Sequence, residues 1–195
     1  TSVASLAQQA ATLMELAEEA NAAFALNSDE SYHRFFYDQA RQGADRIGKL
    51  FEKAVRDGQL AESALFDKQR NPIPKTDPQK YSSSFDRFTD QQLPTVQEAV
   101  KGAHPSMVFA IAAAPDGYVP THNQRFSKQP TGDVQHDTLH CRSKRLFDDP
   151  TGRRCGSHEQ ALLLQTYKRD TGEVMHDLSV PIMVNGEHWG GLRLG

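Results

Sequence analysis

The sequence predicts an α+β domain in which long helices come first and a five-stranded antiparallel sheet follows. Residues 2–26 contain neither glycine nor proline, and their apolar residues recur at a helical period. From residue 107 the apolar residues instead form short runs separated by turn signals. The chain closes on two such runs joined by Asn185-Gly186, a pair favoured in hairpins because the turn needs positive φ twice.

Composition narrows the range of functions. The 195 residues carry a formal net charge of −3, and 37% are hydrophobic, which suits one globular domain. This charge argues against nucleic-acid binding, which needs a basic face. No apolar run approaches the roughly 18–20 residues of a membrane span, so we expect no membrane insertion by this chain. Cys141 and Cys155 lie outside any C-x-x-C motif, so we expect free thiols, with one disulfide as the alternative.

Residues 1–26 are predicted to form a connecting helix of coiled-coil type. Its apolar positions alternate between spacings of three and four, and they are Val3, Leu6, Ala10, Leu13, Ala17, Ala20 and Phe24. An ordinary amphipathic helix is the alternative, because three of these positions are alanine. We expect this helix to hold a weak homodimer, and we expect a longer coiled coil upstream because the helix already runs near residue 1.

Residues 27–106 are predicted to be a helical region that packs on the sensor core. A helix over 30–57 ends at Asp57-Gly58, and a short helical turn follows. The three prolines in 67–80 indicate a surface loop. A further helix is expected over 82–100, bent or split at Pro94.

Residues 107–195 are predicted to be the sheet-bearing core. A hairpin is expected around Pro115-Asp116-Gly117, and residues 133–147 return to helical character. Three strands then follow, joined by tight turns at 170–172 and 185–186. An α+β domain with this order of elements is typical of PAS and Cache-like folds.

Several long segments of the second half resemble a sensory domain of bacterial methyl-accepting chemotaxis proteins. The segments are "GYVPTHNQRFS", "TGD", "HCRSKRLFDDPTG", "LLLQTYKRDTGEVMHDLSVPI" and "VNGEHWGGLRLG", and the resemblance extends over roughly residues 45–195. In that family a PAS-like or Cache-like module binds a small molecule and passes a conformational signal along helices to a kinase-controlling coiled coil. The resemblance implies a ligand-binding input domain without catalytic activity.

The chain ends on a strand, so we expect the signalling module to precede this domain and the domain to be cytoplasmic. The alternative is that a further helix follows residue 195 and leads to a signalling module downstream. A periplasmic location is the alternative if membrane segments flank it. Two other functions remain open: a haem- or metal-based redox or gas sensor on the same scaffold, and a dimerisation module with a vestigial pocket. An enzyme is not expected, since the sequence has no G-x-S-x-G elbow and no P-loop.

Arginines between the expected second and third strands are the first candidates for ligand binding. In PAS and Cache-like folds this segment forms one wall of the cavity, and a guanidinium group binds carboxylate or phosphate bidentately. Arg142 and Arg145 are favoured, which indicates an anionic small-molecule ligand. The alternative is that they lie on a solvated face and pair with Asp148 and Asp149.

Polar residues in and near the strands form a second group. Gln165 and Tyr167 share one face of a predicted strand, and Asp177 is a polar residue among apolar neighbours, so it needs a partner. Asp177 either receives a ligand amine or hydroxyl or pairs with an arginine. The end of the first hairpin offers three more candidates, each with a turn role as the alternative: Tyr118, His122 and Asn123.

A possible metal site completes the candidates. His136 and His140 are one helical turn apart, and Cys141 is adjacent, so together they can offer imidazole and thiolate ligands. Two histidines on a predicted helix are a weak signal. We therefore expect no cofactor, with haem or zinc at His136, His140 and Cys141 as the alternative.

Overall fold

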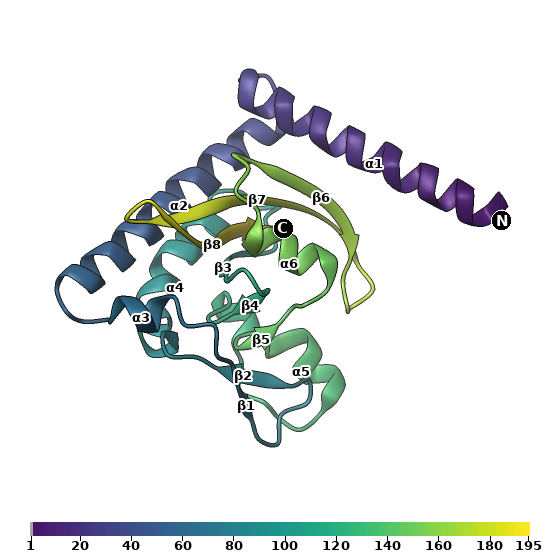
Figure 1. The fold of residues 1–195 in the computed structure, drawn as a ribbon. Coiled ribbons are helices and arrows are strands. Elements are labelled where there is room, and N and C mark those ends of the chain that lie inside the picture. The colour runs from purple at the N-terminus through teal and green to yellow at the C-terminus, as the bar shows by residue number, and fades with distance from the viewer. Residues whose placement is uncertain (1) are drawn as a thin grey trace.

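The computed structural model describes residues 2–195, and in it the chain is an α+β domain built on two four-stranded antiparallel sheets (Figure 1). The α-helices are α1 (Ser2–Asn27), α2 (Tyr32–Arg56), α3 (Glu62–Leu65), α4 (Asp86–Gly102), α5 (Val134–His140) and α6 (Pro150–Ser157). The strands are β1 (Asn71–Ile73), β2 (Lys80–Ser82), β3 (Ala110–Ala113), β4 (Tyr118–Val119), β5 (Arg145–Leu146), β6 (Leu163–Lys168), β7 (Val174–Val184) and β8 (Glu187–Leu194). A single 3₁₀ turn, η1, covers Gln124–Phe126.

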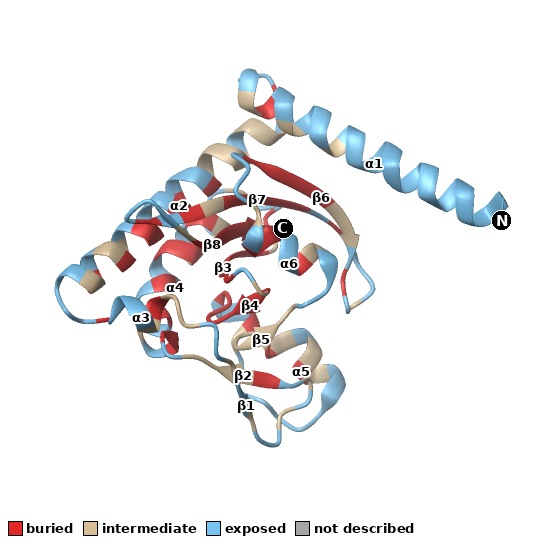
Figure 2. Cartoon of the chain, viewed as in Figure 1, coloured by how far each residue is buried: buried red, intermediate tan, exposed pale blue. Residues whose placement is uncertain are grey.

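The two long N-terminal helices form as expected, but they differ in what they bury. Ser31 caps α2 by accepting the N–H of His33, and α2 packs its apolar face on the main sheet. In α1, by contrast, Ala25 is the one buried residue among Ser2–Asn27. Figure 2 shows α1 as an almost wholly exposed rod that projects from the body of the domain. No helix within residues 2–195 is long and apolar enough to cross a membrane.

The main sheet has the strand order β3-β8-β7-β6. Its three C-terminal strands form the expected meander, and Asn185 (φ 50°) and Gly186 (φ 79°) supply the two positive φ angles of the last hairpin turn. β3 then pairs with β8, so that Ala110 lies opposite Leu194. Helices α2 and α4 cover one face of this sheet, and α6 lies against the other.

The expected single five-stranded sheet is not confirmed, because the strands divide between two sheets. The turn at Pro115-Asp116-Gly117 forms, with Gly117 at φ +87°. After it, however, β4 pairs with β5 in a second sheet of order β1-β2-β5-β4. Residues 133–147 are helical only as far as His140, and the loop predicted over 67–80 contains β1 and the start of β2.

Side chains occupy the free edge of β3, which explains why β4 does not pair there. Ala110 donates its N–H to Asn123 Oδ1 at 2.8 Å, and Ala112 donates to Gln97 Oε1 at 2.9 Å. Both side chains are buried. The edge amides of β3 therefore have partners without a neighbouring strand, and the main sheet ends there.

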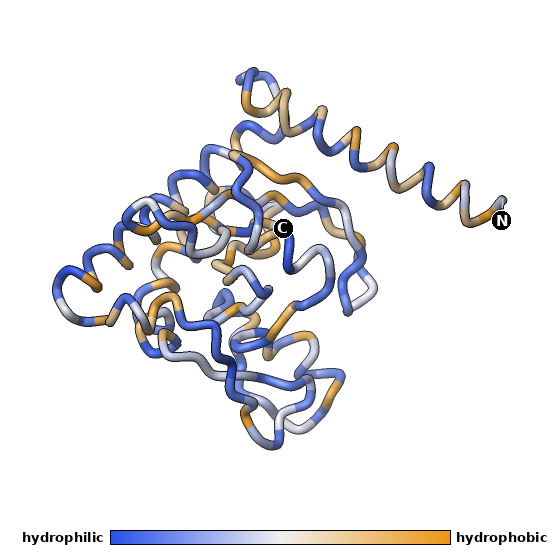
Figure 3. Tube along the Cα trace, viewed as in Figure 1, coloured by the Kyte–Doolittle hydropathy of each residue, from blue (hydrophilic) through white to orange (hydrophobic). Residues whose placement is uncertain are grey.

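One hydrophobic core extends from α2 to the main sheet. Figure 3 shows that the hydrophobic residues are distributed in short stretches along the whole chain, so the core is assembled from many segments. Trp189 lies in this core between Phe51 and Phe85, with ring centroids 4.7 Å and 5.6 Å away. Its indole N–H donates to the carbonyl of Leu65 at 2.9 Å, so β8 is tied to α3. The division of the chain at residues 26 and 106 stays a prediction.

Glycines let α6 approach the main sheet backbone to backbone. A Cβ on Gly191 would lie 2.0 Å from the carbonyl oxygen of Cys155, and one on Gly156 would lie 2.0 Å from that of Ala114. No side chain fits at such distances, so these positions require glycine for close approach. The turn at 148–152 begins α6, because Asp149 caps it by accepting the N–H of Gly152.

We predict that Gly191→Ala lowers the free energy of unfolding by roughly 1–3 kcal/mol, the usual cost of overpacking. The matched control is Gly102→Ala at the end of α4, where a Cβ meets nothing within 4 Å. That control should leave stability unchanged or raise it by up to about 1 kcal/mol. Urea unfolding followed by circular dichroism measures both. Equal stability of Gly191→Ala and the wild type would contradict the close packing of α6 on β8.

Candidate functional site

A basic pocket of about 340 Å³ lies between the main sheet and the segment that follows β4. Its floor comes from β3, β6 and β8, and its opposite wall comes from residues 142–149. The volume is at the lower end of the range for small-molecule sites. The side chains that line it are mainly arginine and aromatic.

Four arginines converge on the basic pocket, and each stacks on an aromatic ring. Arg142 and Arg145 lie 5.0 Å and 4.7 Å from the centroid of Phe147. Arg193 lies 4.9 Å from the Tyr167 ring, and Arg169 lies 5.7 Å from the Phe109 ring. Stacking on flat rings stabilises the guanidinium groups away from water and fixes their orientation.

Ion pairs hold these arginines in place. Asp170, in the turn between β6 and β7, accepts from Arg142 at 3.0 Å and from Arg145 at 2.9 Å. Arg193 pairs with the buried carboxylate of Asp177. Although the side chains of Arg142 and Arg193 are each only 6% exposed, their charges therefore have partners.

Three guanidinium N–H groups are left over after these pairs. Arg142 Nε, Arg145 Nη1 and Arg169 Nε are buried, and none has a hydrogen-bond partner in the structure. A buried donor without a partner costs on the order of 1–3 kcal/mol. All three belong to residues that line the basic pocket, which makes this pocket the candidate site for an anion.

The electrostatics of the basic pocket also favour an anion. Burial holds the pKa of His122 well below its ordinary value, and the charges of Arg142 and Arg169 lower it further. Burial lowers the pKa of Arg142 to about 10, although Asp170 works in the opposite direction. Burial alone would raise the pKa of Asp170, but Arg142 and Arg145 outweigh it and hold that pKa below its usual value. His122 is thus neutral at pH 7, while the arginines keep the pocket positive.

Of the eight ligand-binding candidates from the sequence, four line the basic pocket: His122, Arg142, Arg145 and Tyr167. The structure gives two others a role in holding the fold. Tyr118 is fully buried, and its hydroxyl donates to Asp86 at 2.8 Å, which ties β4 to α4. Asn123 occupies the edge of β3, and its Nδ2 donates to Glu98 at 3.0 Å.

Gln165 and Asp177 are engaged in hydrogen bonds and an ion pair within the fold. Gln165 donates to the carbonyl of Thr151 at 3.2 Å and so joins β6 to α6. Asp177 takes the second of its two predicted alternatives, because it pairs with Arg193, and it also accepts from the thiol of Cys155 at 3.2 Å. Neither side chain is among the residues that line the pocket.

Sequence reasoning missed Arg169, Asp170 and Arg193 as parts of this site. Tyr167 and Arg169 are two residues apart, as residues on one face of a strand are, and this spacing was the available signal. Arg193 enters the site only through the pairing of β8 with β7, which places it opposite Ser179. Asp170 lies in a turn, and no local pattern shows which side chains it meets.

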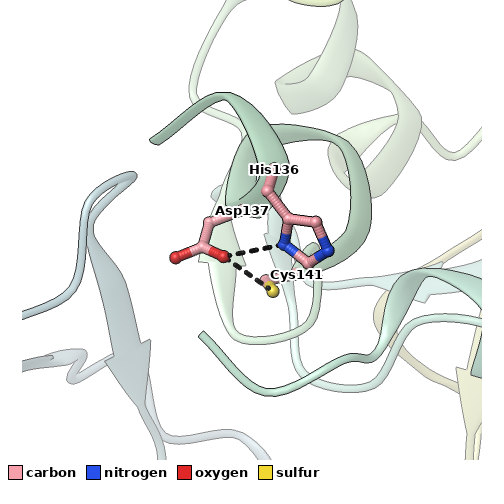
Figure 4. Close-up of side chains that lie close together, drawn as sticks. All are labelled: His136, Asp137 and Cys141. Atoms are coloured by element: carbon pink, nitrogen blue, oxygen red, sulfur yellow. Dashed lines mark hydrogen bonds and ion pairs between the residues drawn. The ribbon is translucent and has the colours of Figure 1, made fainter. Parts of the chain in front are cut away.

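A second cluster of potential ligands lies on α5 and is drawn in Figure 4. His136 Nδ1 lies 3.1 Å from Asp137 Oδ1, and Cys141 Sγ lies 3.5 Å from the same oxygen. The third potential metal ligand in the structure is therefore Asp137, where the sequence predicted His140. The ring of His140 still lies near His136, with 4.7 Å between the two centroids. The three residues are a donor set that zinc accepts.

Asp137 already has another role, however. Its carboxylate accepts the N–H groups of Thr131 at 2.9 Å and Gly132 at 3.0 Å. It also accepts the Thr131 hydroxyl at 2.8 Å. The loop before α5 is held in this way without any metal, so the cluster has a structural explanation in hydrogen bonding alone.

An apolar groove of about 620 Å³ lies on the other face of the main sheet, in the angle between α1 and α2. Met14, Phe36 and Leu178 line it. It has none of the arginines of the basic pocket. The apolar groove is therefore suited to packing against a hydrophobic surface, whereas the basic pocket is suited to a charged ligand.

Comparison with models of known protein families, with curated proteins and with solved structures finds no match for this chain.

We predict that the domain loses stability as the pH falls below about 6.5, the ordinary pKa of histidine. His122 has a lowered pKa in the folded state, so the unfolded chain binds a proton that the folded chain does not. The contribution is fully present above pH 6.5 and is lost as the pH falls toward the folded pKa. At pH 5.5 the expected loss from this group is on the order of 1 kcal/mol.

Urea unfolding at pH 7.5 and pH 5.5 measures this loss. His122→Gln should make stability less dependent on pH, whereas His176→Gln, at an exposed position, should leave the dependence as it is in the wild type. The same pH dependence in wild type and His122→Gln would show that the buried imidazole is not the source.

Proposed function

We propose that this chain is the small-molecule-binding input domain of a bacterial chemotaxis receptor, and that the basic pocket binds its ligand, a small anion. The single observation that carries the proposal is the set of three buried arginine N–H groups without partners in one cavity. Most buried polar groups in folded proteins have hydrogen-bond partners, so three unpartnered groups on the lining residues of one cavity favour a ligand there. The resemblance of residues 45–195 to chemoreceptor sensory domains supports the receptor context, and we place the domain in the cytoplasm.

The geometry supports α1 as the output element. β6 carries Tyr167 and Lys168 at the basic pocket, and the backbone N–H of Thr166 in the same strand donates to Glu18 of α1 at 2.7 Å. A change in the position of β6 on ligand binding would therefore act directly on α1. Strand β6 lies at the edge of the main sheet, where movement disrupts the fewest hydrogen bonds.

Two rival functions differ from this proposal in measurable ways. A haem sensor would absorb visible light through a Soret band, which His140→Ala or His136→Ala would abolish. A zinc-based sensor would use the cluster of His136, Asp137 and Cys141. A dimerisation module with a vestigial pocket would bind no small anion, and no ligand in a thermal-shift screen would stabilise it.

We predict that a panel of small carboxylates and phosphates contains compounds that stabilise the domain, by about 2.7 kcal/mol at a concentration of 100 Kd. Arg145→Ala should weaken the binding of such a compound by roughly 1.5–3 kcal/mol, because it removes a charged hydrogen bond. Isothermal titration calorimetry measures the affinity.

The matched control for this binding experiment is Arg87→Ala, which removes an exposed arginine of α4. Arg87 is not among the residues that line the basic pocket. It should bind the compound as the wild type does. An unchanged affinity in folded Arg145→Ala would remove that residue from the site, and equal losses in both variants would point to a non-specific effect of net charge.

We also propose that α1 forms a weak homodimer through its seam of exposed apolar residues. Leu6 and Leu13 are 64% and 67% exposed, and Phe24 is 52% exposed. An isolated helix with one buried residue gains little from the rest of the domain, so a partner helix is needed to cover it.

We predict that sedimentation of residues 1–195 shows a concentration-dependent monomer–dimer equilibrium. Leu6→Glu combined with Leu13→Glu should leave a monomer, because charges then face each other across the seam. The control is Gln8→Glu combined with Glu15→Gln, which changes exposed polar positions of α1 without changing its net charge. A dimer that persists in the leucine variant would place the interface elsewhere.

A further inference from the structure

The charge balance inside the basic pocket restricts the charge of its ligand. Four guanidinium groups, those of Arg142, Arg145, Arg169 and Arg193, form ion pairs with three carboxylates. Asp177 neutralises Arg193, and Glu173 pairs with Arg169 at 3.0 Å. The remaining carboxylate, Asp170, is shared by two arginines.

One positive charge is therefore left without a counter-charge, and it belongs to the pair formed by Arg142 and Arg145. The other charged residues that line the basic pocket are Lys168, Asp148 and Asp149, and none of the three forms an ion pair with these arginines. Asp149 is engaged as the cap of α6. Among the ion-paired groups the excess thus amounts to a single positive charge, shared by Arg142 and Arg145.

The unpartnered buried hydrogen-bonding groups on the residues that line the pocket are donors. The free atoms are guanidinium nitrogens, which have no acceptor capacity. His122 adds another donor, because its Nδ1 accepts the N–H of Asn123 at 2.8 Å and the proton of the neutral ring must then lie on Nε2. Phe109, Ile111 and Tyr167 supply apolar surface beside these donors.

Given the proposed function, we infer that the ligand is a small organic monocarboxylate and that Asp170 is the residue that sets its charge at a single negative unit. One carboxylate meets the unpartnered N–H groups and neutralises the excess charge. A second negative charge would be buried without a counter-ion, which is strongly unfavourable. The apolar walls accommodate the rest of the molecule, which inorganic phosphate lacks.

The test compares matched pairs of anions that differ by one charge: butyrate with succinate, and valerate with glutarate, alongside benzoate and inorganic phosphate. Isothermal titration calorimetry at pH 7.5 and constant ionic strength measures each affinity. The wild type should bind at least one monocarboxylate, and should bind it at least about tenfold more tightly than its dicarboxylate partner.

Asp170→Asn should shift this preference toward the dicarboxylate, because it releases a second positive charge at Arg142 and Arg145. The affinity for the dicarboxylate should rise at least about tenfold relative to its monocarboxylate partner. Glu187→Gln is the control: it removes the same charge at an exposed position of β8 outside the basic pocket, so the preference should stay as in the wild type.

The outcomes separate this inference from the proposed function. If the wild type prefers a dicarboxylate or phosphate, an anion site exists and only the inference on ligand charge is wrong. If none of these anions binds, the proposed function falls together with it. An unchanged preference in folded Asp170→Asn, or an equal shift in Glu187→Gln, would remove Asp170 as the determinant. The wild-type comparison remains decisive if Asp170→Asn does not fold.

Discussion

The two side-chain amides that occupy the edge of β3 determine how the rest of the domain is arranged. Gln97 and Asn123 bind the N–H groups that a neighbouring strand would bind, and both are buried where water cannot replace them. The chain after β3 must therefore leave the main sheet, and β4 pairs with β5 in the second sheet. The space between the two sheets becomes the basic pocket. A fifth strand added to the main sheet beside β3 would take the place of these amides.

In the proposed function, the unliganded domain loses some stability because the basic pocket keeps its donors ready for a ligand. Burying four guanidinium groups is unfavourable unless each finds a partner, and the structure supplies aromatic faces and carboxylates for most of their surface. The donors that remain unpaired belong to residues that line the cavity. In the proposed function, stacking and ion pairs already orient these residues, so a ligand would not have to order them on binding. Preorganisation of this kind would favour affinity at the expense of the unliganded fold.

Regular periodicity was sufficient to predict α2, α4 and the meander of β6 to β8, because each buries a continuous face or ends in a distinctive turn. Helix α1, which buries only Ala25 among Ser2–Asn27, was predictable from its helical period and from its lack of glycine and proline. The second sheet was not predictable in this way. β4 and β5 have only two residues each, so neither shows an alternation, and their pairing depends on contacts far apart in the chain. The site followed the same rule. Arg142 and Arg145 stand out in a basic segment, whereas Arg193 joins them only through the register of β8.

The single tryptophan of the chain gives the domain an intrinsic optical probe of its helix-covered face. Trp189 is buried against Phe51 and Phe85 and is not among the residues of the basic pocket, so a bound anion does not contact the indole. Its emission reports on the packing of α2 and α3 against the sheet. A change in fluorescence when an anion occupies the pocket would therefore show that a conformational change passes through the sheet to its opposite face. Unchanged fluorescence would mean that the conformational change stays near the pocket.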